Sequence, residues 1–338
     1  MRPDRTVRRT VALSALLAAT LTATAACSGS DTAGSSPDAE TVEVSFGYIP
    51  DFNGTSLLAI AEDQGLWDKH GVEATTPSFT NGPLQIQALG TGDLDFGYIG
   101  PGAFWLPASG QAKIVAMNTL GQADRVVGQP GIESMEDLRG KKVAVPEGTS
   151  GDMILTLALE EAGMTKDDVE IVPMEPSAIV AALSSGKVDG AGFWYPALAT
   201  VQKQVPDLVE IADNTDFEET VAFPTAFVAG NEVVENDPEK LDRVLAVLRD
   251  AIDYRAEHMD EAIELTAEFN DLPVADVKAD AENVQVLSLE EIDGYTEDGT
   301  FDTWLSGMED YFVAAGQLPE AVDPAEFYTG DQFLEAGK

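Results

Sequence analysis

The chain has 338 residues, of which 44% are hydrophobic, and it carries 60 acidic against 19 basic side chains, for a formal net charge of −41. A field of this sign repels nucleic acid and anionic lipid headgroups, so a nucleic-acid partner is excluded. The length suits two domains better than one. No window after the N-terminus reaches the roughly 18–20 apolar residues of a membrane span. The acidity is typical of a solvated surface, because the sequence lacks the dense carboxylate loops of a cation-storage protein, and no metal site is predicted.

The first 26 residues have the order of an export signal. A basic start is followed by an uncharged stretch from Val11 to Ala23 and by small residues before Cys27, the single cysteine of the chain. The apolar stretch is too short for a stable membrane anchor. A cysteine after small residues resembles a bacterial lipobox, although Thr24 departs from the usual Leu, so we expect lipidation at Cys27. A plain signal peptide with an incidental cysteine is the alternative. Residues 27–40 are rich in Gly and Ser, which predicts a flexible tether.

Strand-like and helical segments alternate from Thr41 onward. Strands are predicted at Val42–Tyr48, Val72–Phe79, Asp95–Ile99, Ile114–Asn118, Lys142–Pro146, Val169–Val172, Gly190–Trp194 and Val221–Val228. Helical apolar spacing lies between most of the earlier ones, beginning with Ser56–Gly65. Long helices are predicted near 237–257, 258–269 and 298–315. This alternation predicts an α/β fold with mostly parallel sheets flanked by helices.

An internal echo indicates two similarly built lobes. The run Ala88–Asp95 is matched by Ala182–Asp189, and each combines a helix end, a glycine and an aspartate that leads into a strand. Gly92 and Gly186 suit the left-handed position after a helix. A single large α/β domain with a helical tail is the alternative to two lobes.

The turns that lead from strands into helices carry the functional signal. They are Asn81-Gly82-Pro83, Gly100-Pro101-Gly102, Glu147-Gly148-Thr149-Ser150 and Tyr195-Pro196. Proline suits the first helical position, and the free N–H groups of a helix start attract anions. In open α/β sheets, ligands bind beyond the carboxyl ends of the strands, where such turns gather. Ordinary helix capping is the alternative for any one turn.

The motifs in this order resemble those of the solute-binding proteins for taurine, alkanesulfonates and nitrate, a family that also includes binders of thiamine-pyrimidine precursors. The resemblance rests on Phe46–Pro50, Ile60–Trp67, Gly92–Gly97, Asp137–Pro146 and Val188–Leu198. It implies a two-lobed periplasmic-binding-protein type II fold, with one lobe at 41–122 plus 222–338 and the other at 123–221. It further implies an exported lipoprotein, monomeric, that takes a small sulfonate-type anion or zwitterion such as taurine to an ABC permease and its ATPase.

The resemblance and the turns together predict the ligand-binding residues. They are Asp51, Phe52, Asn53, Asn81, Gly82, Gly100, Pro101, Gly102, Gly148, Thr149, Ser150, Trp194 and Tyr195. An oxyanion would take hydrogen bonds from backbone N–H groups and from the hydroxyls of Thr149 and Ser150. Asp51 and Asp124 could meet an ammonium group or could be ordinary exposed acids. The nearest basic candidates, Arg125 and Lys203, cannot be placed from the sequence.

Other ligands and an enzyme remain as alternatives at this stage. The same fold could bind nitrate, a pyrimidine or an aromatic acid. Related folds serve desulfinating and pyrimidine-synthesising enzymes, whose chemistry depends on cysteine or on histidine-rich sites. Here no cysteine follows Cys27, and the two histidines, His70 and His258, stand in a predicted turn and an outer helix. The sequence therefore predicts a binding protein with no catalytic residues and no cofactor.

Overall fold

Two β-sheets organise the computed structural model, which describes residues 41–217 and 221–338. The predicted export signal, the tether and Cys27 lie outside the described residues. The first sheet has the order β11-β4-β10-β3, and the parallel pair β1-β2 is joined to β3 by a bridge between Phe46 and Phe96. Its strands are β1 (Val42–Ser45), β2 (Val72–Thr75), β3 (Phe96–Ile99), β4 (Lys113–Gly121), β10 (Pro224–Ala229) and β11 (Val284–Val286).

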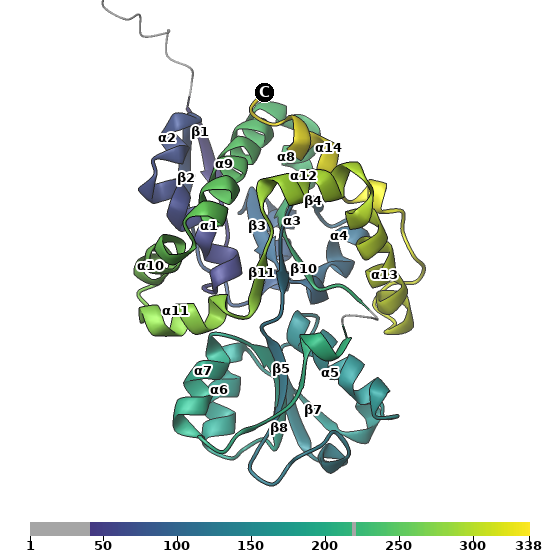
Figure 1. Cartoon of the computed structure of the whole chain (residues 1–338). Coiled ribbons are helices and arrows are strands. Elements are labelled where there is room, and N and C mark those ends of the chain that lie inside the picture. Colours follow the sequence, from purple (N-terminus) through teal and green to yellow (C-terminus); the bar gives the residue numbers. More distant parts are fainter. Residues whose placement is uncertain (1–40, 218–220) are drawn as a thin grey trace, which may run out of the picture. The chain divides into compact units, whose positions relative to one another are not determined.

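The second sheet has the order β7-β6-β8-β5-β9. Its strands are β5 (Asp124–Gly128), β6 (Lys142–Val145), β7 (Glu170–Pro173), β8 (Gly190–Trp194) and β9 (Val209–Asp213). Figure 1 shows β4 leading directly into β5, so that one extended segment passes from the first sheet to the second. The chain returns to the first sheet at β10.

In the second sheet the strands mostly share one direction, as predicted, whereas every neighbouring pair of the four-stranded sheet β11-β4-β10-β3 is antiparallel. The pairings of β5 with β8 and β9, and of β10 with β3 and β4, are antiparallel. The strands β6, β7 and β8 are parallel to one another. A strand that enters at the edge where the others end must run against them. The sheets are therefore more mixed than the sequence indicates.

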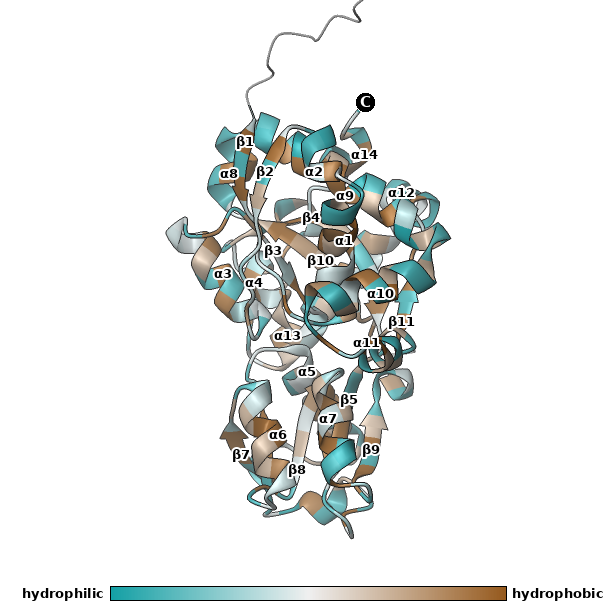
Figure 2. Cartoon of the chain, turned by 90° about the vertical axis from the view of Figure 1, so that its left-hand side faces the viewer, coloured by the Kyte–Doolittle hydropathy of each residue, from teal (hydrophilic) through white to brown (hydrophobic). Residues whose placement is uncertain are grey.

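Helices flank both sheets. The first sheet is accompanied by α1 (Phe52–Asp63), α2 (Leu66–Lys69), α3 (Gly82–Thr91), α4 (Trp105–Ala108), α8 (Asn231–Asn236), α9 (Pro238–Glu257), α10 (Met259–Phe269), α11 (Val274–Ala281), α12 (Leu289–Glu297), α13 (Thr300–Ala314) and α14 (Gly330–Glu335). The second is accompanied by α5 (Ser150–Glu161), α6 (Pro176–Ser184) and α7 (Ala197–Gln204). Short 3₁₀ turns occur at Pro101–Ala103, Glu136–Leu138, Lys166–Asp168, Asn214–Phe217 and Pro324–Glu326. Figure 2 shows hydrophilic residues along the outer helices α10 and α12, as expected for helices that bury one face.

The predicted elements are present, with two kinds of departure. The first helix begins at Phe52 rather than near Ser56, because the Asp51 side chain accepts the Gly54 N–H at 2.6 Å and caps the helix four residues earlier. Strands β5, β9 and β11 were not predicted. The predicted left-handed glycines are confirmed, with φ of 77° at Gly92 and 66° at Gly186.

The buried core does not divide at the predicted lobe boundaries. One apolar cluster extends from the first sheet into α5 and β6, and a smaller one lies between β8, α6 and α7. The division into 41–122 plus 222–338 and 123–221 therefore stays a proposal, although the chain crosses between the sheets near both boundaries. Across the described ranges, no helix has the length and apolar character needed to cross a membrane.

Candidate functional site

A cavity lies between the two sheets, at the ends of strands from both. Its volume is about 40 Å³, against the roughly 10–15 Å³ that one water molecule requires on the same measure, so it suits a small solute. The lining comes from both sides of the cavity: Ile49, Asp51, Asn53, Gly82, Pro83, Tyr98, Gly100, Pro101, Ala103, Gly121, Ala123, Asp124, Thr149, Ser150, Trp194, Tyr195 and Thr225. This is the position that the carboxyl-end rule for α/β sheets predicts.

The wall from the first sheet is held by a buried chain of amide and hydroxyl groups. The Asn53 side-chain oxygen accepts from the Thr119 hydroxyl at 2.6 Å, and Thr119 contacts Thr225 at 2.8 Å. The Asn118 amide donates to the Asn53 carbonyl at 2.9 Å. Behind it the fully buried Arg255 donates to the Asn118 side chain at 2.8 Å. These contacts fix the first turn of α1 against β4 and β10.

The wall from the second sheet combines the start of α5 with the end of β8. Two of its predicted donors already have partners within the protein. The Thr149 hydroxyl donates to the Pro146 carbonyl at 2.6 Å, and the Gly148 N–H donates to the Asp152 carboxylate at 3.1 Å. The expected oxyanion cradle is therefore partly occupied, which leaves Ser150 as its hydroxyl at the cavity.

Three buried carboxyl groups gather at the cavity. Asp51 and Asp124 belong to its lining, at 6% and 4% exposure. Asp280 of α11, at 1% exposure, stands behind them and accepts the Phe52 N–H at 2.6 Å. Burial, with repulsion from Asp280 and Asp124, holds the pKa of Asp51 well above its usual range. Burial raises the pKa of Asp124, and it raises that of Asp280 to about 7.

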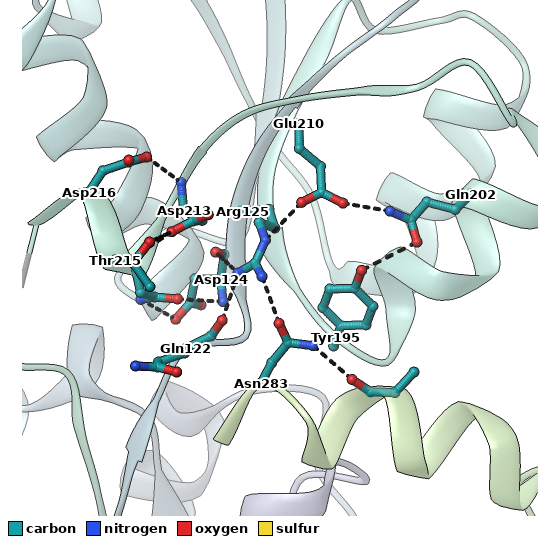
Figure 3. A network of polar contacts seen from close by, with 12 residues as sticks. Gln122, Asp124, Arg125, Tyr195, Gln202, Glu210, Asp213, Thr215, Asp216 and Asn283 are labelled. Atoms are coloured by element: carbon teal, nitrogen blue, oxygen red, sulfur yellow. Dashed lines mark hydrogen bonds and ion pairs between the residues drawn. The ribbon is translucent and has the colours of Figure 1, made fainter. Parts of the chain in front are cut away.

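The two basic candidates from the sequence do not reach the cavity lining. Arg125 donates to Glu210 at 3.0 Å and to Asn283 at 2.6 Å, and Figure 3 shows its guanidinium between these two partners. Lys203 pairs with Asp276 at 2.6 Å. Within the described ranges the cavity lining contains no lysine, arginine, histidine or cysteine.

Nine of the thirteen predicted ligand-binding residues line the cavity, namely Asp51, Asn53, Gly82, Gly100, Pro101, Thr149, Ser150, Trp194 and Tyr195. The other four do not line this cavity. Phe52 is fully buried in the core. Asn81 caps α3 and donates to Glu175 at 2.9 Å. Gly102 packs against the Thr149 backbone, and Gly148, at φ 71°, packs against the Trp105 ring.

The sequence did not single out several residues of this site. Tyr98 and Thr225 lie on neighbouring strands and face the cavity, and Asp280 comes from a helix more than two hundred residues after Asp51. Neither a strand tyrosine nor an acid on an acidic helix carries a local signal. Tyr98 and Thr225 could have been indicated only by the alternation of side-chain directions along β3 and β10, together with the order of these strands in the sheet.

Contacts between the two sides close the cavity at its rim. Glu175, before α6, accepts from the Thr80 hydroxyl at 2.7 Å and from the Asn81 amide at 2.9 Å. Arg125 and Lys203 form the contacts with Asn283 and Asp276 described above. An apolar groove that includes Ile49 and Trp194 continues outward from the cavity.

A cavity enclosed by two α/β lobes defines the periplasmic-binding-protein class, and comparison with solved structures confirms this fold. The alkanesulfonate-binding protein from Xanthomonas axonopodis pv. citri, solved with MOPS, matches with a TM-score of 0.67 at 22% identity, over 86% of this chain and 99% of that one. A desulfurization enzyme, DSZB, matches with a TM-score of 0.64 at 16% identity, over 87% and 98%. Both likenesses establish the fold alone.

The chain belongs to the family described as "NMT1/THI5 like", whose model matches residues 53–262. A Brucella abortus (strain 2308) protein named "Putative binding protein" is 50% identical over 295 residues, which cover 87% of this chain and 92% of that protein. An aliphatic sulfonates-binding protein of Bacillus subtilis (strain 168), also so named as putative, is 26% identical over 69% of this chain and 72% of its own. The taurine-binding periplasmic protein of Escherichia coli (strain K12) is 35% identical over 37% of this chain and 40% of its own.

Proposed function

We propose that this chain is the solute-binding component of an ABC importer. It is exported, anchored at the outer face of the cytoplasmic membrane by a lipid on Cys27, and acts as a monomer. It holds a small sulfonate-type solute, an anion or a zwitterion such as taurine, and delivers it to a permease and its ATPase.

The observation that carries this proposal is the enclosed cavity with lining from both sides. Two lobes can separate and close around a solute, and the rim contacts of Glu175 favour the closed form. The names of the relatives point to sulfonate-type solutes. Nitrate, a pyrimidine or an aromatic acid would use the same cavity.

An enzyme of the same fold is the rival proposal, because DSZB shares the fold. Enzymes that form covalent intermediates need a nucleophile beside an activating base. The cavity lining in the described part of the chain holds neither cysteine nor histidine, and the described histidine His70 contacts Asp250 at 2.5 Å, away from the cavity lining. The lining supports a role in binding.

A thermal-shift panel across sulfonates, nitrate, pyrimidines and aromatic acids tests the proposed role. A solute at about one hundred times its Kd stabilises a protein by about 2.7 kcal/mol, so a true ligand raises Tm measurably, and calorimetry then gives its affinity. Conversion of any panel member to a product would instead favour the enzyme. For the anchor, Cys27→Ala should release the protein from the membrane fraction of a Gram-positive host, and retention like that of wild type would contradict lipidation.

A further inference from the structure

Two of the acids at the cavity carry an oxygen with no hydrogen-bond partner among the described residues, although the Ser150 hydroxyl beside Asp124 lowers the pKa of that carboxyl group in part. Asp124 lies at the start of β5, and its Oδ2 accepts from the Asn214 amide at 3.1 Å, while its Oδ1 has no hydrogen-bond partner among the described residues. The Asp280 Oδ1 is likewise without a partner there. Buried carboxylate oxygens are almost always bonded in folded proteins, so an unbonded one that lines a cavity indicates a missing donor.

None of these acids forms an ion pair with a described residue, and the charge of Arg125 lowers the pKa of Asp124 only in part. The ion pairs found among the described residues include none of Asp51, Asp124 and Asp280. The nearest buried cation, Arg255, donates to Ser56 and Asn118 instead. A buried carboxylate without a partner is strongly disfavoured, and each neighbouring acid adds repulsion.

An anionic solute would add to the negative charge at these acids, whereas a cationic solute would offset it. Entry of a sulfonate without a positive group would place a further negative charge beside Asp51 and Asp124. An ammonium group presents three N–H donors, which match two carboxylates and a neutral acceptor such as the Asn53 side chain. The rings of Trp194 and Tyr195 in the lining add faces that attract cations.

We propose that the solute carries a protonated amine, and that Asp51 and Asp124 bind it while Asp280 holds the start of α1 in place behind them. The proposal rests on the proposed solute-binding function and narrows its ligand to amine-bearing molecules. The sulfonate end, where present, lies toward Ser150 and the turn at Gly82. A bound metal ion is the other cation that could meet these acids, but no group of three or more metal-ligating side chains is found within the described ranges.

The test compares solutes in matched pairs that differ only by the amine. Calorimetric titration is carried out with taurine against ethanesulfonate, β-alanine against propionate, and butylamine against butanol. In a pair that binds, the member with the amine should bind at least about one hundredfold more tightly than the member without it. The amine-free member lacks the two charged contacts with Asp51 and Asp124. Equal or tighter binding by an amine-free partner overturns the proposal.

Variants connect the preference to the named residues. Asp124→Asn keeps the shape of the side chain and should reduce the preference for the amine by at least about tenfold, without lowering Tm in the absence of solute, since it removes an unpaired buried charge. Glu309→Gln is the matched control, because Glu309 is also buried, at 2% exposure, but lies on α13 and accepts from Val322. An unchanged preference in Asp124→Asn contradicts the assignment of Asp124.

The same titrations separate the two levels of failure. If no solute of any pair binds, the proposed solute-binding function fails for this panel, and the amine requirement fails with it. If amine-free members bind, the binding function stands and the amine requirement alone is wrong. Stabilisation by calcium or magnesium alone, abolished by EDTA and by Asp124→Asn, would identify a metal site and also overturn the amine proposal.

Discussion

Two regions of the cavity wall differ in how completely the protein satisfies their polar groups. At the turn 148–150 of the second sheet, the Gly148 N–H and the Thr149 hydroxyl are bonded to protein acceptors. At the acidic side, the Oδ1 atoms of Asp124 and Asp280 have no donor in the part of the chain that the structure describes. The turn was the predicted anion cradle, and the acids were the ambiguous residues. The difference teaches that the position of a motif alone does not show which of its polar groups are free to meet a ligand.

The largest expected effect concerns Asp280 and the pH dependence of stability. Its folded-state pKa of about 7 lies above the ordinary value of an aspartate, 3.8, so the folded protein binds the proton more tightly than the unfolded chain does. Stability relative to Asp280→Asn is therefore full below about pH 4 and falls as the pH rises toward about 7, by at most about 4 kcal/mol. Urea titrations at pH 4, 6 and 8 measure this difference.

The control for that comparison is Asp68→Asn, at an exposed acid of α2. It should follow the pH profile of wild type. Parallel profiles for wild type and Asp280→Asn would show that Asp280 is not held in an unfavourable site, and the contrast between the two regions would weaken.

The second prediction tests whether the turn at Thr149 serves packing between the lobes. A Cβ at Gly102 would lie 2.1 Å from the Thr149 carbonyl group, so Gly102→Ala should hinder closure while each lobe remains folded. Overpacking of this kind opposes the closed form by about 1–3 kcal/mol, which corresponds to a loss of affinity of about tenfold to one hundredfold. Calorimetry with the best ligand measures it, alongside Tm without ligand.

Gly90→Ala provides the matched substitution, because a Cβ there meets nothing within 4 Å. It should leave affinity unchanged. A Gly102→Ala protein that binds as wild type does would mean that the close approach of Gly102 to Thr149 is not needed in the bound state.

The third prediction separates the two hydroxyls of the predicted cradle. Thr149→Ala removes the hydrogen bond to Pro146 and should lower the free energy of unfolding by about 1 kcal/mol with little change in affinity. Ser150→Ala should instead weaken binding, because that hydroxyl is in the cavity lining beside Asp124. Thermal melts and titrations of the two single variants give both quantities. A loss of affinity in Thr149→Ala would mean that the Thr149 hydroxyl does contact the solute, as the sequence predicted.

The smallest effect is spectroscopic. Trp194 lines the cavity at 9% exposure, so its fluorescence should change when a solute binds. Trp194→Phe should abolish the response, whereas Trp304→Phe, on α13, should keep it. A fluorescence response that persists in Trp194→Phe would show that another tryptophan gives the signal. Trp105, beside Gly148, would be the first residue to examine.

Much of the fold could be predicted because its signals are local. Apolar spacing and left-handed glycines located most strands and helices, and the helix-start turns together with the family resemblance located nine of the thirteen proposed residues at the cavity. The strand β5 was missed, since Asp124 and Arg125 make its beginning resemble a surface loop. In fact Asp124 is buried at the cavity.

The remainder depends on which distant segments meet. Asp51 and Asp280 belong to the same cluster only because α11 packs beside α1, and a sequence rich in acids gives no reason to select these two. The Thr149 hydroxyl looked available because its acceptor, the Pro146 carbonyl, is revealed only by the local backbone path. Which polar groups are buried and which are hydrogen-bonded therefore becomes known only from the three-dimensional structure.

The contacts of Glu175 across the rim have a practical consequence for measurement. Thr80 and Asn81 belong to one side of the cavity and Glu175 to the other, so the proposed separation of the lobes would break their contacts. A pair of dyes attached near positions 80 and 175 would change separation with each capture event. With the export signal and tether removed, the chain could thereby serve as a reagentless optical sensor for its own solute.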